Sequence, residues 1–459
     1  MKLFDTSLFI FRRDLRLDDN TALNAALSQS KQVIAAFIFD PQQIQPHPYQ
    51  SQAGLQFMLQ ALADLQQQLA DHNGKLYLFH SQPIELISQL NAEHKLDALF
   101  VNRDYTPFSR QRDADLYQHC QQLGLSFHSH NDLLLNEPEQ LLKANGSPYQ
   151  VFTPFYNRAK QNPVVLPTGL TNGQFFTASS QYDQPQLLDQ FRADNNNPFQ
   201  GGRQQVLAIL NDLQHCQNYA EQRDFPALDA TSNLSAHLKF GCCSVREAFY
   251  AVLHNLGSEH PLIRQFYWRD FFSHIAFHYP QVFGHAFNSR YDAINWSKDQ
   301  DRFWAWANGK TGFPIVDAGM RQLNQTGCMH NRLRMITASF LVKDLHISWR
   351  WGERYFAQKL IDYDPCVNNG NWQWAASTGC DAQPYFRIFN PWLQQQKFDP
   401  DCLYIKRWLP ELQSFNPKAI HNWQNSPLAG DYPPPMVDHS QQSQAIKAIF
   451  KALNPLGTD

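Results

Sequence analysis

Short apolar runs alternate with longer amphipathic segments in the first 130 residues. The runs are rich in β-branched and aromatic residues and cover residues 7–11, 33–39, 75–79, 98–102 and 126–128. Between them, segments such as 52–69 and 110–123 carry apolar residues at helical spacing. Strands that alternate with helices indicate a parallel sheet covered by helices. We therefore expect an α/β domain with a Rossmann-like parallel sheet over residues 1–130.

The pattern changes after this region. A tract from about residue 145 to 202 is rich in Pro, Gly, Asn and Gln and contains few periodic segments, which is typical of a connection between domains. Beyond it the pattern is helical, with a capping box at Ser244 and Glu247 and a helix start at Pro261. We expect an interdomain linker over residues 131–201 and a larger all-α domain over residues 202–459.

Composition narrows the class of protein. The 38 basic and 41 acidic residues give a net charge of -3, so any contact with nucleic acid must come from a local patch. The eight cysteines form no C-x-x-C pair and no ligand cluster, which favours reduced thiols and no metal site. Charged residues interrupt the first apolar run, and no apolar stretch reaches about 18 residues. We expect a cytoplasmic protein without a membrane segment.

Several common catalytic motifs are missing from the sequence. The tripeptide Gly309-Lys310-Thr311 resembles the end of a phosphate-binding loop, but Trp304 stands where that loop requires glycine, so a turn is expected. There is no G-x-G-x-x-G, H-E-x-x-H or G-x-S-x-G motif. Nicotinamide, zinc-protease and serine-hydrolase chemistry therefore lack support.

One polar segment lies beside an expected helix start. Thr231-Ser232-Asn233-Leu234-Ser235 offers three hydroxyl groups where free backbone N–H groups can hold a diphosphate. An ordinary helix cap explains the same residues, so this segment alone does not identify a ligand.

Two further segments predict a shared polar surface. Helical spacing places Asn331, Arg334 and Met335 on one side of a helix, while Arg332 points elsewhere. In Asp362-Tyr363-Asp364-Pro365 the second aspartate is the expected N-cap, with proline at the first helical position. We expect a buried ion pair between Arg334 and Asp362, although surface caps and a solvated charge pair explain each segment separately.

All eleven tryptophans lie beyond residue 267. Indole is readily oxidised, and its broad face can stack on a nucleic-acid base with a gain of about 1–3 kcal/mol per base. Both properties suit light-driven flavin chemistry.

These segments resemble the photolyase/cryptochrome family, and the resemblance extends from residues 11–16 to residues 408–412. Its most specific stretches are residues 223–226, 231–235, 267–271, 312–320, 329–335 and 368–374. In detail they are most similar to class I cyclobutane pyrimidine dimer photolyases. The resemblance implies an N-terminal α/β antenna domain and a C-terminal helical domain that binds FAD and DNA.

The resemblance also implies a set of FAD-binding residues. They are Tyr219, Thr231, Ser232, Asn233, Leu234, Ser235, Arg269, Asn331, Arg334, Asp362, Asp364 and Asn368. Asn368 is expected to face flavin N5, where a neutral amide can hydrogen-bond without repelling the anionic reduced flavin that the family uses.

Catalytic roles follow from the same resemblance. Trp372, Trp349 and Trp296 match the family's electron-transfer chain, in order from the flavin to the surface, and Asn368 and Gln265 complete the catalytic set. Ordinary core packing is expected for Trp304, Trp306, Trp351, Trp392, Trp408 and Trp423.

Damaged DNA is the implied partner. Trp268 and Trp374 match residues that stack on a pyrimidine dimer flipped out of the duplex. Other expected substrate contacts come from Gln265, Asn331, Met335, and from Arg223, Arg332 and Arg387. The three arginines would bind phosphate without reading sequence, and surface ion pairs are an equally good explanation for them.

Some positions depart from the dimer-photolyase pattern. Gln265 stands where those enzymes usually carry glutamate, and glutamine cannot supply a proton or a negative charge. The (6-4) photolyases have glutamine there, but they pair it with histidines where this chain has Asn331 and Met335. Phe283 replaces a lysine associated with folate antennas, so a deazaflavin or a second flavin is favoured over folate as an antenna, and an empty site also stays open.

The sequence therefore predicts light-driven repair of cyclobutane pyrimidine dimers by electron transfer from excited reduced FAD. The alternatives are a (6-4) photolyase, a cryptochrome-type blue-light photoreceptor and, more remotely, a light-independent flavin oxidoreductase. We expect a monomer with no obligate protein partner.

Overall fold

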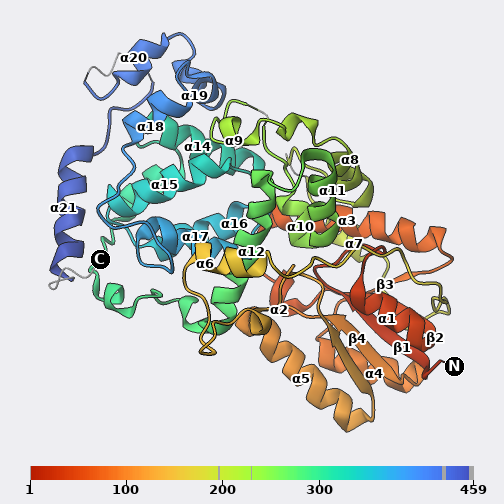
Figure 1. Ribbon diagram of the computed structural model, residues 1–459. Helices are drawn as coiled ribbons and strands as arrows, with labels where there is room; N and C mark the ends of the chain where they lie inside the picture. Colours follow the sequence, from red (N-terminus) through yellow and green to blue (C-terminus); the bar gives the residue numbers. More distant parts are fainter. Residues whose placement is uncertain (1, 195–196, 229, 426–430, 454–459) are drawn as a thin grey trace. The chain divides into compact units, whose positions relative to one another are not determined.

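The computed structural model describes residues 2–194, 197–228, 230–425 and 431–453 (Figure 1). The chain forms two compact units. Unit 1 contains Met1–Gln214 and Ser232–His278, and unit 2 contains His215–Thr231 and Tyr279–Asp459.

Unit 1 is built on a five-stranded parallel sheet. Its strands are β1 (Phe4–Phe11), β2 (Ser30–Ile38), β3 (Leu76–Phe79), β4 (Ala98–Asn102) and β5 (Ser126–His130), in the order β3-β2-β1-β4-β5. All five coincide with the apolar runs in the sequence. The α/β class predicted for the N-terminal region is confirmed.

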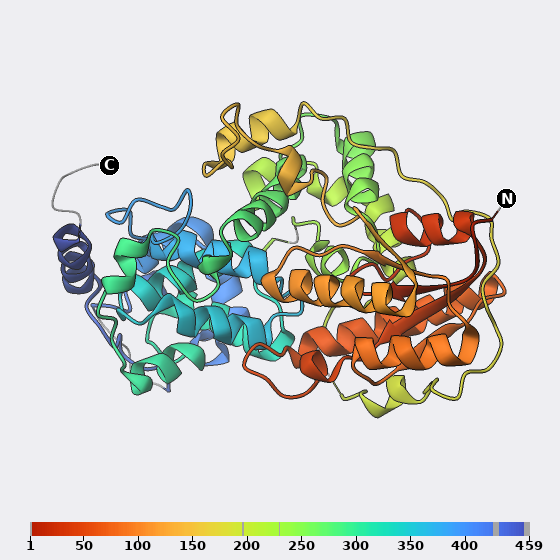
Figure 2. The same ribbon diagram turned by 90° about the horizontal axis from the view of Figure 1, so that it is seen from below.

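Helices cover both faces of this sheet. Side chains alternate between faces along a strand, and Leu8 and Ile34 belong to the core formed with α4 (Pro83–His94) and α5 (Pro107–Leu123). The intervening buried residues face the other side. That side is covered by α1 (Thr21–Gln29) and α3 (Gln52–Asp71). The crossovers through α1 and α3 run along the sheet in one direction and those through α4 and α5 run in the other, so right-handed connections place the two helix pairs on opposite faces. Figure 2 shows the strands and these helices from a second direction.

Unit 1 contains further helices, of which α11 and α12 begin where the sequence predicts. They are α2 (Pro41–Ile44), η1 (Pro138–Gln140), α6 (Phe152–Ala159), α7 (Leu187–Gln190), α8 (Arg203–Asn211), α10 (Ser235–Phe240), α11 (Val245–Leu256) and α12 (Pro261–His278). The capping box of α11 is confirmed, since Ser244 and Glu247 bond reciprocally. The tract expected as a linker is partly ordered along the sheet, where Phe175 pairs with Val33.

Unit 2 is helical. Its elements are α9 (Tyr219–Gln222), η3 (Pro280–Val282), η4 (Ser289–Ala293), α13 (Gln300–Ala307), α14 (Pro314–Thr326), α15 (Asn331–Lys343), α16 (Trp349–Lys359), α17 (Pro365–Ala376), α18 (Pro391–Phe398), α19 (Leu403–Trp408), η5 (Pro410–Leu412), α20 (Pro417–His421) and α21 (His439–Ala452); η2 (Gln214–Cys216) spans its boundary. The core lies among α13 to α19 and includes the buried Trp306, Trp349 and Trp372. The predicted helical C-terminal region is confirmed. In the part of the chain that is described, no helix is both long and apolar enough to cross a membrane.

Candidate functional site

The expected ion pair between Arg334 and Asp362 is present in unit 2. Arg334 lies in the first turn of α15, and its Nη2 is 2.9 Å from Asp362 Oδ2. Its Nε donates to the carbonyl of Met329 at 2.9 Å. The side chains are 30% and 10% exposed, so the pair lies at the edge of the core and is less buried than expected. This exposure leaves the guanidinium accessible to an anionic or carbonyl-bearing ligand.

Asn331 and Met335 share a side of α15, as their spacing predicts. The Asn331 Nδ2 approaches the Met335 sulfur at 3.7 Å, and the amide is exposed. Arg332 points to a different partner, the carboxylate of Asp224, at 2.6 Å.

Asn368 is placed by the N-terminal cap of α17. Asp364 accepts from the backbone N–H of Val367 at 3.0 Å, and Pro365 occupies the first helical position, as expected. One turn later the buried Asn368 donates from Nδ2 to the carbonyl of Glu353 at 3.0 Å. Its side-chain oxygen accepts no hydrogen bond from the described residues. This orphaned acceptor fits a ligand that brings an N–H donor, as the N5 of reduced flavin does.

The three tryptophans of the expected electron-transfer chain belong to one hydrophobic core in unit 2. Trp349 and Trp372 are buried on α16 and α17, and Trp296 is half-buried at the edge of the core. A Cβ on Gly352 would lie 2.1 Å from Trp372 Cη2, so only glycine allows α16 to pack this closely on the indole. The indole positions are therefore set by backbone packing.

One expectation about the other tryptophans is wrong. Trp306, Trp392 and Trp423 are buried, but Trp304 is 52% exposed and does not pack in the core. The reason is its place on α13, where Trp306 occupies the inward side.

In unit 1, three expected site residues lie on α12. Gln265 makes one long hydrogen bond, from Nε2 to the Pro261 carbonyl at 3.4 Å, and Arg269 donates to the Leu133 carbonyl at 2.6 Å. Trp268 stacks on Phe152 with ring centroids 3.6 Å apart and planes inclined by 6°. Phe152 thus covers one face of this indole, and the ring of Phe272 lies 5.6 Å away at an inclination of 30°.

The segment from Thr231 to Ser235 does not act as the cap of α10. The N-cap is Leu234, which provides no side-chain hydrogen bond to the helix. Asn233 has a φ of +53°, so the chain turns sharply before α10 begins. Ser232 is half-buried and Ser235 is exposed. Capping therefore does not account for hydroxyl groups at Ser232 and Ser235.

The arginines expected to contact DNA phosphate differ in their surroundings, and so does Trp374, the second residue expected to stack on a base. The Arg332 guanidinium lies 4.4 Å from the ring of Phe398 in addition to its ion pair. Arg223 lies over the ring of Tyr219 at 5.5 Å, and Arg387 is exposed. Trp374 is half-buried against the unit 2 core.

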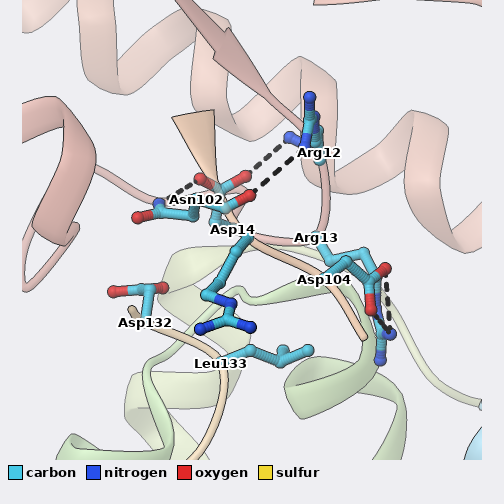
Figure 3. A pocket seen from close by; sticks show the side chains of 8 residues that line it. Arg12, Arg13, Asp14, Asn102, Asp104, Asp132 and Leu133 are labelled. Atoms are coloured by element: carbon cyan, nitrogen blue, oxygen red, sulfur yellow. Dashed lines mark hydrogen bonds and ion pairs between the residues drawn. The ribbon is translucent and has the colours of Figure 1, made fainter. Parts of the chain in front are cut away.

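Unit 1 contains a pocket that the sequence did not locate. Its lining residues are Arg12, Arg13, Asp14, Asn102, Arg103, Asp104, Asp132 and Leu133 (Figure 3). They follow β1, β4 and β5, at the point where the strand order reverses. Open α/β sheets bind ligands at this position. The cavity itself has a volume of only about 10 Å³, far below the usual range for small-molecule sites.

Hydrogen bonds and an ion pair fix the side chains that line this pocket. Asp14 accepts from the Arg12 backbone N–H at 2.6 Å and from Asn102 Nδ2 at 2.5 Å, and Arg13 lies 3.2 Å from Asp104 (Figure 3). Burial alone would raise the pKa of Asp104, but Arg13 and other nearby cations lower it. Burial, together with the charge of Arg112, lowers the pKa of Arg12 to about 10. Most charged side chains of the pocket are therefore already paired with an opposite charge within the protein.

Family models match both parts of the chain. Residues 7–169 match the DNA photolyase model, and residues 262–452 match the FAD binding domain of DNA photolyase. The fold and site thus define a flavin-binding protein with an N-terminal photolyase domain. The chain is 40% identical to the deoxyribodipyrimidine photo-lyase of Vibrio cholerae over 96% of this chain and 98% of the relative. It belongs to the DNA photolyase family.

Solved structures agree with this assignment. The photolyase of Sulfolobus tokodaii, described with two FAD molecules and a light-harvesting cofactor, has a TM-score of 0.89 at 42% identity and covers 97% of this chain and 100% of its own. The class III photolyase of Agrobacterium tumefaciens has a TM-score of 0.91 at 35% identity, with 98% of each chain covered. A cryptochrome of Synechocystis has a TM-score of 0.89 at 30% identity and covers 98% of this chain and 100% of its own.

Proposed function

We propose that the protein repairs cyclobutane pyrimidine dimers in DNA under blue light, with FAD as its cofactor. The observation that carries this proposal is Asn368, a buried neutral amide with an unused acceptor at the family's flavin position. Relatives named deoxyribodipyrimidine photo-lyase from Vibrio cholerae and Escherichia coli, 40% and 38% identical over nearly the whole chain, support the lesion class. Within the family we propose class I, on the motif residues of this chain.

The FAD-binding residues that we propose are those that the resemblance implies. They are Tyr219, Thr231, Ser232, Asn233, Leu234, Ser235, Arg269, Asn331, Arg334, Asp362, Asp364 and Asn368. When bound and reduced, the flavin supplies the excited electron that splits the dimer and takes it back. Asn368 tunes this electron donor because its amide hydrogen-bonds the ring without adding negative charge beside the reduced anion.

The protein's part in lesion binding is stacking and phosphate contact. We assign Trp268 and Trp374 to stacking on the flipped dimer, since each base stack contributes about 1–3 kcal/mol and extrusion of a damaged base costs a few kcal/mol. Arg223 and Arg387 are the better candidates for phosphate contact. Arg332 is held by Asp224 and would have to exchange that partner for phosphate.

Gln265 holds the thymine carbonyls in this proposal. Within the described part of the chain its amide makes a single long hydrogen bond, so it can reorient toward a ligand. It cannot protonate the dimer, and repair must therefore proceed without a carboxylic acid at this position.

A cryptochrome-type photoreceptor is the second candidate. It is favoured by the Synechocystis structure, whose similarity spans the whole chain. The two candidates differ in one measurable property, which is the ability to restore pyrimidines in the light.

We also propose a second chromophore at the unit 1 pocket. A deazaflavin or a second flavin is favoured over folate, and the Sulfolobus tokodaii structure with two FAD molecules provides a precedent in a relative. The side chains that line the pocket would have to move apart, because its volume of about 10 Å³ is far too small for either ring system.

The test is a repair assay with both lesion types. Purified protein should carry FAD, and blue light should restore pyrimidines in DNA with cyclobutane dimers but not in DNA with (6-4) products. Repair of (6-4) products alone would assign the protein to that class. Flavin binding without any repair by the chemically reduced protein would favour the photoreceptor. The same preparation should behave as a monomer in light scattering, and immunofluorescence in its host should place it in the cytoplasm.

A further inference from the structure

Trp372 has a tryptophan neighbour outside the expected electron-transfer chain. The ring centroids of Trp372 and Trp306 lie 6.2 Å apart, with planes inclined by 78°. Both indoles are buried in the core of unit 2. Electron tunnelling falls steeply with distance, so two rings in edge contact exchange charge readily.

From Trp306, ring contacts continue to the protein surface. Tyr355 lies 5.7 Å from Trp306 and 6.4 Å from Trp304, measured between ring centroids. Phe303 bridges the same two indoles at 5.7 Å and 5.3 Å. Trp304 is 52% exposed, so this series of rings ends in water.

We propose that Trp372, Trp306 and Trp304 form a second exit for positive charge, beside the route through Trp349 and Trp296. The inference rests on the proposed light-driven flavin chemistry. Trp372 gives one electron to the excited oxidised cofactor, Trp306 gives one electron to Trp372, and Trp304 gives one electron to Trp306. Trp304 then loses its indole N–H proton to water, and an external thiol restores it by donating an electron and a proton.

Local charge favours this branch over the expected route. The Arg350 guanidinium lies over the ring of Trp349 at 4.7 Å, where it repels a positive charge on that indole. Its ion pair with Asp292 offsets only part of this repulsion, because the cation is in direct contact with the ring. Among the described residues, no lysine or arginine lies over Trp306.

Proton chemistry explains why the charge ends at Trp304. Trp306 Nε1 donates to the Thr337 carbonyl at 3.0 Å, and a carbonyl is too weak a base to take the proton. The Tyr355 hydroxyl donates to Asn324 Oδ1 at 2.6 Å, and an amide oxygen is likewise too weak a base to take the proton. Neither ring can shed a proton, so neither can retain the charge. Trp304 is in contact with water and can deprotonate.

The first test measures flavin photoreduction in the FAD-loaded protein with a thiol present. Trp349→Phe should slow photoreduction without abolishing it, and the double variant with Trp306→Phe should lose the remainder. Trp423→Phe is the matched control, since Trp423 is also fully buried and donates from Nε1 to a backbone carbonyl at 2.9 Å. Complete loss in Trp349→Phe, with flavin still bound, would overturn the branch.

The second test locates the radical directly. The loaded protein is illuminated in air without thiol, so that oxygen traps an indole radical, and peptides are analysed by mass spectrometry. Light-dependent oxygenation of Trp304 that disappears in Trp306→Phe supports the branch. Oxygenation confined to Trp296 contradicts it. A wild-type protein that binds no flavin, or that shows no photoreduction, would instead reject the proposed function.

Discussion

The indole of Trp268 and the ring of Phe152 form a nearly parallel stack within unit 1, with 3.6 Å between centroids. The stack joins α12 to α6 and fixes the orientation of the indole. An indole held in this way loses little further side-chain freedom when it stacks on a base.

Replacing Trp268 tests the stacking role. Trp268→Ala should weaken binding of dimer-containing DNA by about 1–3 kcal/mol, because one base stack is lost. Phe152→Leu should have a smaller effect, since the indole stays but is held less firmly. Fluorescence anisotropy with damaged and undamaged duplexes measures both. Equal affinity of Trp268→Ala and wild type for damaged DNA would refute the role.

Arg332 and Asp224 form an ion pair, and replacing one or the other should change the affinity for DNA in opposite directions. Asp224→Asn should release Arg332 and strengthen DNA binding, while Arg332→Ala should weaken it and reduce the dependence of log K on log salt by about 1. Arg387→Ala is the comparison, because Arg387 is exposed. Salt titrations of DNA affinity measure these slopes. If Asp224→Asn leaves the affinity unchanged, the arginine has only a structural role.

The amide of Asn368 should control the flavin potential. Asn368→Asp would place a carboxylate beside the reduced anion, and two unit charges 4 Å apart repel by about 4 kcal/mol at an effective dielectric of about 20. We expect a lower midpoint potential and faster reoxidation in air. Asn371→Asp, on the exposed side of the same helix, is the matched control. Spectroelectrochemical titration of the bound flavin gives the potential, and equal shifts in both variants would argue against a specific role for Asn368.

Trp372 should separate photoreduction from repair. Trp372→Phe removes the first electron donor of both proposed routes, so photoreduction of oxidised flavin should be lost. Repair by chemically reduced enzyme should be retained, because the dimer receives its electron from the flavin. Absorbance changes under blue light and a repair assay with dithionite-reduced protein test the two halves. Unchanged photoreduction would exclude Trp372 as the donor.

Lys343 should make stability depend on pH. This side chain is buried against Ala376, Ser377 and Phe450, and burial lowers its pKa to about 7 from 10.5. Between these values the unfolded state binds more protons than the folded state, so the contribution of this group to stability rises with pH. Lys343→Met should flatten the rise between pH 7 and 9. Thermal unfolding of both proteins across this window measures the difference, and parallel curves would contradict the expectation.

The secondary structure was largely readable from the sequence because its signals are local. The five strands and the starts of α11, α12 and α17 follow from apolar spacing, Ser244 with Glu247, Pro261, and Asp364 with Pro365. The ion pair of Arg334 with Asp362 was also expected, from the polar residues of two short segments.

The candidate site was less readable where a partner is distant in the sequence. Nothing near Trp268 indicates that Phe152 covers one of its faces, and nothing near Arg332 indicates Asp224. The pocket beside Asp14 and Asp104 depends on three strands ending together.

The sequence by itself determined the elements, the family and the identity of the chemistry-bearing side chains. Only the tertiary structure decided which of those side chains are already paired with or packed against another residue, and which are exposed to solvent. Trp304 and Trp306 show the difference, since they stand two positions apart on one helix, yet one is in water and the other touches Trp372. The physical reason is that local spacing sets the direction of a side chain on its helix, whereas burial depends on the distant surfaces that pack against it.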